Sequence, residues 1–422
     1  MEILKLINFI TSIVFVVCYA YQLVYIPIVL FFRRRKERKI AESRQGRETV
    51  YKDIAILICG RNEEKVIGDL LDSCKEQTYP EEHLKVFVMA DNCTDNTADV
   101  SRDHGAIVYE RFNDTLIGKG YALEELYGHL QEDYPQGFDG YLILDADNLL
   151  ESNYVEKMNE SLNDGHDVIT SFRNSKNYSS SWISSGQGLW FLRESRYLNN
   201  ARHILGISSG ISGTGYMLSR NALSELGGKW PFHLLTEDLE YTAYLVTNEK
   251  KVAFCADAMF YDEQPITIKQ SWRQRLRWTQ GYLQVLRHYG VSLIKGIFKG
   301  SFSCFDTLMN IAPAYFLSFV SILANIIFII VGLIQGGNPL DALQSIGELI
   351  FYCCSIAFLV GLITMITEWK IIRASVPRKI FSLITFPIYM LTFVPIAIFA
   401  LFAKKSWKPV GHTVTANDFK KQ

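Results

Sequence analysis

Tyr141-Leu142-Ile143-Leu144-Asp145-Ala146-Asp147-Asn148 is an apolar run that ends abruptly on two carboxylates. Such a run predicts a buried strand, and the ligands of open α/β sheets bind at the carboxyl ends of strands. Asp145 and Asp147 are two residues apart, so an extended chain would present both on one face, able to share a hard divalent cation or to divide metal and ligand between them. Taken alone, an Asp-Ala-Asp sequence is more often a helix cap beside a solvated carboxylate.

Length and composition indicate a soluble domain joined to apolar segments. The chain has 422 residues, too many for one ordinary domain, and 49% of them are hydrophobic, yet the mean hydropathy is only +0.08. The net charge of −1 gives no support for nucleic-acid binding, which expects a strongly basic domain. The eight cysteines form no Cys-x-x-Cys pair. This pattern disfavours a zinc site or a disulfide framework and fits a reducing cytosolic face.

The first 32 residues predict a transmembrane helix. Residues 3–32 are almost continuously apolar and run into the basic segment 33–39. Because the Lys/Arg excess follows the span, its C-terminal end is expected in the cytoplasm. A cleaved signal peptide is not expected, since there is no basic n-region and no small-residue cleavage site. Residues 33–52 are predicted to be a basic juxtamembrane linker.

Residues 53–264 alternate short β-rich runs with helical patterns, which predicts a cytoplasmic α/β domain with a mostly parallel sheet. The expected strands are residues 54–58, 85–89, 106–109, 141–144, 167–170 and 252–255, and the expected helices include residues 63–75, 94–104 and 119–131.

The C-terminal third is predicted to return to the membrane. Residues 265–303 are expected to form interfacial amphipathic helices, because 267–289 carry Trp, Arg and Gln on a helical period. Residues 304–403 contain two further spans, 305–334 and 346–367, and a third apolar segment.

That third segment, residues 380–402, carries Pro387 and Pro395 and is followed by basic residues. A full crossing would place the basic tail outside, so we expect a kinked re-entrant or tilted hairpin that leaves residues 404–422 as a cytoplasmic tail. Trp407 and His412 in this tail either close over the site or belong to an ordinary polar terminus.

Polar clusters follow the predicted strands and open the predicted helices. They are Cys59–Glu64 after the first strand, Asp91–Thr97 after the second, Gly118-Lys119-Gly120, Leu234–Asp238, and Gln274–Trp278 on the interfacial helix. Each has an ordinary structural explanation, such as Thr94 as a helix N-cap, Thr236-Glu237-Asp238 complementing a helix dipole, or interfacial Arg and Trp side chains. Their ordered combination is more specific than any one of them.

In this order the motifs resemble those of the family 2 glycosyltransferases. The similarity is to their membrane-embedded branch, which contains hyaluronan, chitin, poly-N-acetylglucosamine and cellulose synthases. It covers residues 53–289 and rests on Asp91, on Asp145 and Asp147, on Thr236-Glu237-Asp238, and on Gln274, Arg277 and Trp278. Residues 213–216, Gly-Thr-Gly-Tyr, look like the acceptor-side loop of the family. Many relatives have an Asp-Asp-Gly-Ser type sequence where this chain has Asp91-Asn92-Cys93-Thr94-Asp95, which leaves Asp91 and Asp95 as alternatives.

The resemblance implies a nucleotide-sugar-binding domain of the glycosyltransferase A type. It implies that Asn62, Glu63 and Asp91 lie on the uridine side of a UDP-sugar, with Lys119 near the donor and Asp145 on its ribose or sugar. Asp147 would coordinate Mg²⁺ or Mn²⁺. Asp238 would be the catalytic base, with Thr236 and Glu237 beside it, and Gln274, Arg277 and Trp278 would hold the diphosphate and the acceptor sugar.

The function expected from this resemblance is inverting transfer onto a growing β-linked polysaccharide, coupled to export, in the bacterial plasma membrane. Accessory export proteins or a homo-oligomer are possible partners. Addition of one sugar to a membrane lipid is the alternative within the enzyme class. A non-catalytic scaffold, a dinucleotide oxidoreductase and a transporter fit less well, because the expected carboxylates are all present, residues 210–215 lack Gly-x-Gly-x-x-Gly spacing, and the spans are few.

Overall fold

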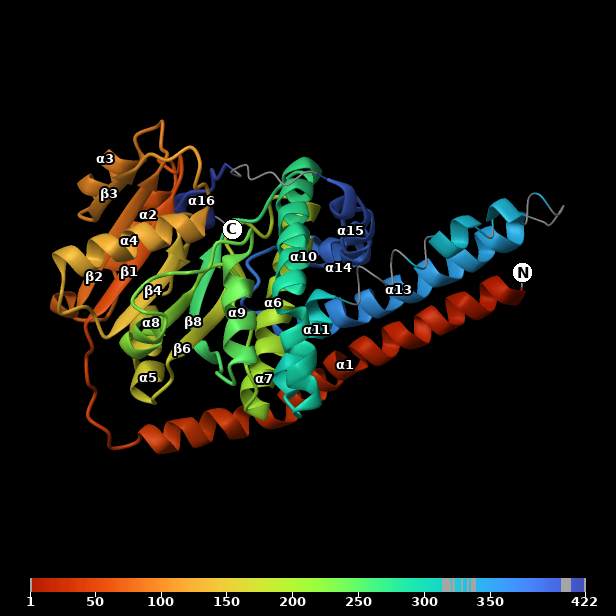
Figure 1. The fold of residues 1–422 in the computed structure, drawn as a ribbon, viewed down its shortest axis with the longest axis horizontal. Coiled ribbons are helices and arrows are strands. Elements are labelled where there is room, and N and C mark those ends of the chain that lie inside the picture. The colour runs from red at the N-terminus through yellow and green to blue at the C-terminus, as the bar shows by residue number, and fades with distance from the viewer. Residues whose placement is uncertain are drawn as a thin grey trace.

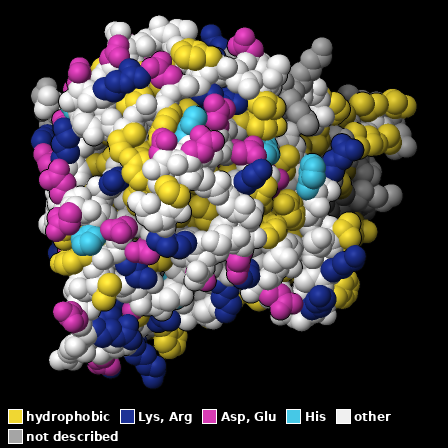
Figure 2. All heavy atoms as spheres, turned by 60° about the vertical axis from the view of Figure 1, so that its left-hand side comes forward, with side chains coloured by type: hydrophobic (Ala, Val, Ile, Leu, Met, Phe, Trp, Pro, Cys, Tyr) yellow, Lys and Arg dark blue, Asp and Glu magenta, His cyan; other side chains and the backbone are white. Residues whose placement is uncertain are grey.

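The computed structural model describes residues 2–312, 320, 323–327, 329–331, 334, 339–403 and 411–420. An α/β domain carries the sheet, and the long helices α1 (Glu2–Arg44) and α13 (Pro339–Thr367) run side by side away from it (Figure 1). Acidic and basic side chains are interspersed over the face shown in Figure 2, as a net charge near zero leads one to expect.

The sheet has eight strands in the order β3-β2-β1-β4-β7-β6-β8-β5. Neighbours pair in parallel except at β4–β7, β6–β7 and β5–β8, which are antiparallel. The strands are β1 (Ile54–Gly60), β2 (Leu84–Asp91), β3 (Ile107–Arg111), β4 (Gly140–Asp145), β5 (Leu149–Leu150), β6 (Val168–Ser175), β7 (Tyr216–Ser219) and β8 (Ala253–Asp262). All six predicted strands and the mostly parallel α/β class are confirmed. The two strands that were not predicted, β5 and β7, are too short to give a periodic signal.

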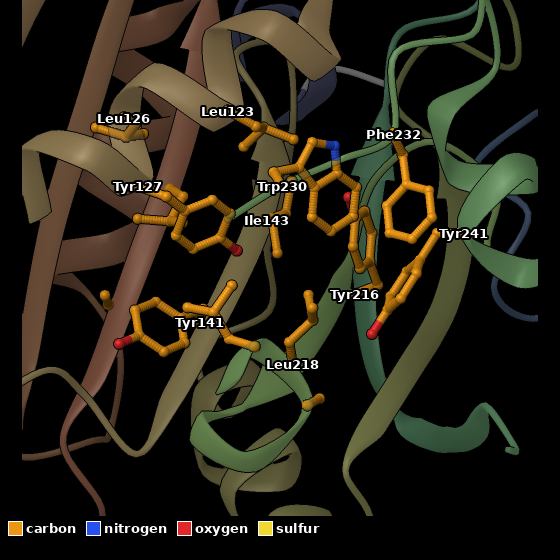
Figure 3. Close-up of a cluster of buried hydrophobic side chains, with 14 of the residues drawn as sticks. Leu123, Leu126, Tyr127, Tyr141, Ile143, Tyr216, Leu218, Trp230, Phe232 and Tyr241 are labelled. Carbon is orange, nitrogen blue, oxygen red and sulfur yellow. The ribbon is translucent and has the colours of Figure 1, made fainter. Parts of the chain in front are cut away.

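Helices cover both faces of the sheet. On one face, α4 (Lys119–Asp133), α8 (Arg220–Glu225) and α9 (Glu237–Thr247) bury a cluster that includes Leu126, Tyr127 and Trp230 (Figure 3). On the other face, α2 (Ile67–Lys75) and α5 (Tyr154–Asn163) bury residues such as Leu70. Because both faces are covered, β1 and β4 read as nearly continuous apolar runs.

Two helices begin later than predicted. The helix expected from residue 63 is α2, which starts at Ile67, and the helix expected from residue 94 is α3 (Thr97–Asp103). Thr94 is therefore not the N-cap. Asp95 binds the start of α3 instead, because its Oδ1 accepts hydrogen bonds from the backbone nitrogen of Thr97 at 3.1 Å and from its hydroxyl at 2.6 Å.

Residues 33–44 of the predicted basic linker are helical and continue α1. Charged pairs one helical turn apart, Arg33–Glu37 and Arg38–Glu42, support this extension. Arg44, the last residue of α1, binds Asp164 at 2.6 Å and also pairs with Glu160 of α5. These ion pairs hold the C-terminal end of α1 against the α/β domain.

Between β6 and β7 the chain forms a helical insertion that the sequence analysis did not predict. It consists of α6 (Trp182–Arg193), a π-helical segment (Glu194–Asn199) and α7 (Asn200–Leu205). Its buried residues pack against α1, α13 and α14 (Val376–Leu391). The insertion therefore joins the sheet to the apolar helices.

Three helices are long and apolar enough to cross a membrane, within the residues described: Val16–Arg44, Ile346–Thr367 and Val376–Phe402. The last is interrupted at Thr392, between α14 and α15 (Phe393–Phe402). The expected span 305–334 lies partly outside the described residues. Its start is in α11 (Phe302–Ile311), and its other described residues, 320, 323–327, 329–331 and 334, are helical. The expected amphipathic helix is α10 (Ile268–Phe298), which begins with a capping box of Thr267 and Gln270.

Candidate active site

A cavity of about 1360 Å³ opens at the carboxyl ends of β1, β2 and β4 and continues between the apolar helices. Its catalytic-domain end is lined by most of the residues that the sequence singles out: Glu63, Asp91, Lys119, Asp145, Asp147, Thr236, Glu237, Asp238, Gln274, Arg277 and Trp278. The far end is lined by aliphatic residues of α1 and α13, such as Leu23 and Ile350. One continuous space therefore joins the polar site to the membrane helices.

Asp145 ends β4 and contacts Lys119 in the wall of the cavity. The ammonium of Lys119 lies 2.5 Å from Asp145 Oδ1 and donates to the carbonyl of Gly213 at 2.8 Å. Although burial opposes its charge, Asp145 and Glu237 raise the pKa of Lys119, so this lysine is a cation at neutral pH. The pair places one positive and one negative group beside each other at the strand's end.

Asp147 lies two residues further on but in a different environment. It is 5% exposed, and its Oδ2 accepts a hydrogen bond from the backbone nitrogen of Glu263 at 2.8 Å. Burial alone would raise the pKa of Asp147, but His412 and Lys176 hold it below its usual value. Asp147 is therefore an anion, and the two aspartates contact different partners.

The C-terminal segment 411–420 lies against this carboxylate. His412 Nδ1 is 3.0 Å from Glu63, and His412 Nε2 is 3.9 Å from Asp147 Oδ2. Although burial opposes its charge, Asp147, Glu63 and Glu263 raise the pKa of His412 to about 10. Thr413 and Val414 donate backbone hydrogen bonds to Glu263. His412 thus closes over the site, while Trp407 lies outside the described residues.

Two adjacent carboxylates, Glu237 and Asp238, begin α9 on the opposite side of the cavity. Burial and the charge of Asp238 raise the pKa of Glu237 to about 7. Burial also raises the pKa of Asp238, while the backbone nitrogen of Leu239 and the Lys119 ammonium limit that rise. Burial therefore raises the pKa of both carboxylates, and a buried carboxylate of raised pKa is suited to accept a proton.

Thr236 precedes this pair and contacts α10. Its hydroxyl is buried and has no hydrogen-bond partner among the residues described. A Cβ added to Gly281 of α10 would lie only 2.4 Å from the Thr236 hydroxyl oxygen. Glycine at 281 therefore lets α10 approach the start of α9 closely.

Helix α10 brings the three residues of the Gln-x-x-Arg-Trp motif to the cavity. Gln274 Oε1 accepts a hydrogen bond at 2.8 Å from Gln187 of α6, which fixes its orientation. The Trp278 ring packs edge-on against Phe191, with 6.0 Å between centroids. Arg277 has no carboxylate within ion-pair distance in the described part of the chain, so its charge is available to an anionic ligand.

The residues expected on the uridine side separate into two groups. Asp91 ends β2, lines the cavity and forms a buried ion pair with Arg111 at 2.7 Å. Asp95 binds the start of α3 and does not line the cavity, whereas Asp91 does. Asn62 is exposed, its Oδ1 accepts from the backbone nitrogen of Thr94 at 2.8 Å, and it is not part of the cavity lining.

Asp147 is the carboxylate at which the sequence predicts a divalent ion. No three His, Cys, Asp or Glu side chains form a ready-made metal site in the described ranges. Asp147 is nevertheless an anion that lines the cavity, with the His412 ring beside it. Mg²⁺ is usually held by one or two carboxylates together with phosphate oxygens and water, so a single such side chain is chemically sufficient.

Several site residues were missed because no local pattern marks them. Arg173 pairs with Asp262, and Lys176 Nζ donates to the Asp147 carbonyl at 2.9 Å. Arg193 lines the cavity at the end of the unpredicted helix α6. These side chains meet only through the pairing of β6 with β8 and the packing of the insertion.

The model of the family described as "Glycosyltransferase like family 2" matches residues 52–281, more than half of the chain. The chain belongs to this family. The resemblance seen in its motifs is therefore confirmed, and the protein is a glycosyltransferase of this family.

Curated relatives include both polymer and glycolipid synthases. The probable glycosyltransferase YdaM of Bacillus subtilis is 26% identical over 311 residues, which cover 70% of each chain. Poly-beta-1,6-N-acetyl-D-glucosamine synthase of Staphylococcus epidermidis is 25% identical over 65% of this chain and 66% of the relative. Beta-monoglucosyldiacylglycerol synthase of a Synechocystis strain is 25% identical over 56% of this chain and 48% of the relative.

Among solved structures, the mannosyltransferase PcManGT of Pyrobaculum calidifontis, described in complex with GDP-Man and Mn²⁺, is similar with a TM-score of 0.57. The match covers 95% of this chain and 100% of that one at 16% identity. At that identity the similarity concerns the fold, and it extends over the apolar helices as well as the α/β domain.

Proposed function

We propose that this family 2 glycosyltransferase moves a sugar, with inversion, from a UDP-sugar to a hydroxyl group of an acceptor that reaches the site from the membrane. The observation that carries this proposal is the single cavity that joins Asp145, Asp147 and Asp238 to the aliphatic surfaces of α1 and α13.

The donor is assigned to the end of the cavity beneath β1, β2 and β4. Asp91 and Lys119 line that end, and Asp145 beside Lys119 is assigned to the ribose or the sugar. Asp147, with His412 next to it, would hold Mg²⁺ or Mn²⁺, which supplies positive charge to a diphosphate when bound. Arg277, which forms no ion pair with the residues described, is assigned to stabilise the negative charge that develops on the departing UDP.

Asp238 is assigned as the base. It accepts the proton of the acceptor hydroxyl as the oxygen attacks the anomeric carbon, and UDP leaves from the opposite face, so the configuration inverts. Glu237, with a pKa of about 7, retains a proton for part of the time and so reduces repulsion beside the base. Thr236 is assigned no proton transfer, because its hydroxyl is buried against Gly281.

The lining of the cavity favours a lipid acceptor over a polymer. Its far end is built from aliphatic side chains of α1 and α13, including Val16, Leu23, Ile346 and Ile350, which suit acyl or isoprenoid chains. The second candidate is processive synthesis of a polysaccharide, which was the leading expectation from the sequence. It is supported by Trp278, whose ring lines the cavity and can contact a sugar, and by the polymer-forming relative.

We assign the α/β domain to the cytoplasmic side of a bacterial plasma membrane. The basic residues 33–39 follow the apolar part of α1 and support this orientation.

The test is a UDP-release assay on the purified full chain with a panel of UDP-sugars and either Mg²⁺ or Mn²⁺, followed by product analysis. A single glycolipid supports the lipid acceptor, whereas a polymer ladder supports the second candidate. UDP release from no donor, with a folded protein, would contradict both.

A further inference from the structure

Arg193 is a cation at the wall between the catalytic site and the membrane helices. It is the last residue of α6 and lines the cavity. Its Nη2 donates a hydrogen bond at 2.8 Å to Oε1 of Gln22, which lies within the apolar part of α1. Its guanidinium lies 5.1 Å from the centroid of the Trp190 ring.

Arg193 forms no ion pair with the described residues, although the charge of Glu194 limits the fall of its pKa. Nearby arginines each have a carboxylate partner: Arg173 has Asp262, Arg196 has Glu368 at 2.6 Å, and Arg202 has Asp306 at 2.6 Å. For Arg193, no carboxylate lies within ion-pair distance in the described portion of the chain. This difference marks Arg193 as the exception among the arginines of the insertion.

The neighbouring acidic and amide groups are already engaged. Glu194 accepts a hydrogen bond from Ser212, and Asp306 accepts one from Tyr25 in addition to its ion pair with Arg202. Gln22 also donates to Asn310 at 3.2 Å, so its orientation toward Arg193 is fixed.

Burial lowers the pKa of Arg193 to about 10, which still leaves it charged at neutral pH. A desolvated cation of this kind is costly unless an anion approaches it.

We infer that Arg193 binds a phosphate, or a phosphodiester, in the headgroup of the lipid acceptor. This inference rests on the proposed function, since it concerns what enters the membrane end of the same cavity. The planar guanidinium suits the two oxygens of a phosphate, and Gln22 holds it at the boundary between the polar and aliphatic walls. The acyl chains would then lie along α1 and α13, and the headgroup hydroxyl would point toward Asp238.

The test compares two acceptors that differ by the phosphate. Phosphatidylglycerol and diacylglycerol with the same acyl chains are supplied in phosphatidylcholine nanodiscs that hold the full chain, and transfer from the accepted UDP-sugar is measured. Arg193→Gln is expected to raise the apparent KM for phosphatidylglycerol roughly 10- to 100-fold, the range for a hydrogen-bonded charge, and to leave the KM for diacylglycerol unchanged. Arg193→Lys is expected to recover part of the loss.

The matched control is Arg273→Gln, which removes the same charge from an exposed position of α10 and should change neither KM. Thermal unfolding of each variant excludes loss of the fold as the cause. Equal KM values for the two lipids in the wild type, or equal losses for both in Arg193→Gln, would overturn the inference. The inference is also overturned if phosphatidylglycerol stimulates transfer but glycosyl-diacylglycerol is the only product. The phosphate would then belong to a neighbouring bilayer lipid and not to the acceptor.

A binding measurement separates this inference from the proposed function. Fluorescent phosphatidylglycerol is titrated against Asp238→Asn and against the double variant with Arg193→Gln. If no lipid is glycosylated, the lipid-acceptor proposal fails. In that case, weaker binding to the double variant would show that Arg193 binds an anionic lipid without a role in transfer. Equal binding would show that Arg193 does not bind the lipid phosphate at all.

Discussion

His412 Nδ1 lies 3.0 Å from both carboxylate oxygens of Glu63, a residue 349 positions earlier in the chain. The contact brings the C-terminal segment to the first βα loop and places the imidazole beside Asp147. Phe419 anchors the same segment by packing on Tyr261 with 4.6 Å between ring centroids. The last part of the chain therefore completes a site whose other residues come from the α/β domain.

Replacement of His412 by Gln removes the charge that faces Glu63 and Asp147. We expect a lower Mn²⁺ concentration to be sufficient for half-maximal rate, because the imidazolium no longer opposes a second cation beside Asp147 and Glu63, and we expect the KM for the UDP-sugar to rise, because the diphosphate loses a cationic neighbour. Steady-state rates over a Mn²⁺ titration measure both. His288→Gln, on an exposed part of α10, is the matched control. An unchanged Mn²⁺ response would show that His412 has no part in the site.

The pH profile should report the carboxylate pair. Burial raises the pKa of both Glu237 and Asp238, so the rate should fall on the acid side at a pH above the ordinary value of about 4 for aspartate. Glu237→Gln removes a neighbouring negative charge, which lowers the pKa of Asp238 and shifts the acid limb to lower pH. The profile of kcat against pH for both proteins checks this, and a shift toward higher pH would contradict the coupling.

Gly281→Ala tests the contact between α10 and α9. The added methyl would meet the Thr236 side chain at 2.4 Å, so we expect a loss of about 1–3 kcal/mol in the free energy of unfolding and a lower rate. Gly128→Ala in the middle of α4 is the control, since its Cβ would have no atom within 4 Å. There we expect a gain of about 0.4–1 kcal/mol. Denaturant unfolding, followed by a spectroscopic signal of the α/β domain, measures both free energies. Equal effects of the two substitutions would contradict the close contact between α10 and α9.

The two aspartates of the Asp-x-Asp sequence should respond differently to metal. Asp147→Ala should leave a residual rate that no longer depends on Mg²⁺ or Mn²⁺, because Asp147 is the carboxylate assigned to the ion. Asp145→Ala should raise the donor KM and keep the metal dependence, because Asp145 contacts Lys119 instead. Metal titrations of the two variants make the comparison, and the reverse pattern would mean that the roles are exchanged.

The sequence was sufficient where chemistry follows local pattern. Apolar runs that end in polar residues predicted six strands and placed Asp91 and Asp145 at strand ends, since strands covered on both faces carry this signal without any tertiary information. The order of the motifs predicted the family. The grouping of Lys119 with Asp238 around one cavity follows from the sheet once its strand order is known.

Local sequence pattern did not predict the features that depend on strand pairing or on packing between residues distant in the chain. Strand β7 forms because Gly215 approaches β4 through its backbone, donating to the Ile143 carbonyl at 3.0 Å, and four residues in such a strand give no period. Asn62 matched by position, but its side chain is held by Thr94. Arg193 reached the cavity through the packing of an insertion that has no family motif.

The central claim is that Asp238 removes the acceptor proton, and the most direct test is the transfer rate of Asp238→Asn beside Glu237→Gln and the wild type, in purified full chain with saturating donor. The account predicts that Asp238→Asn keeps its thermal stability and its affinity for UDP while transfer falls by about 100-fold or more. Glu237→Gln should keep a much larger share of the rate. Near-normal transfer by a folded Asp238→Asn protein would contradict the claim.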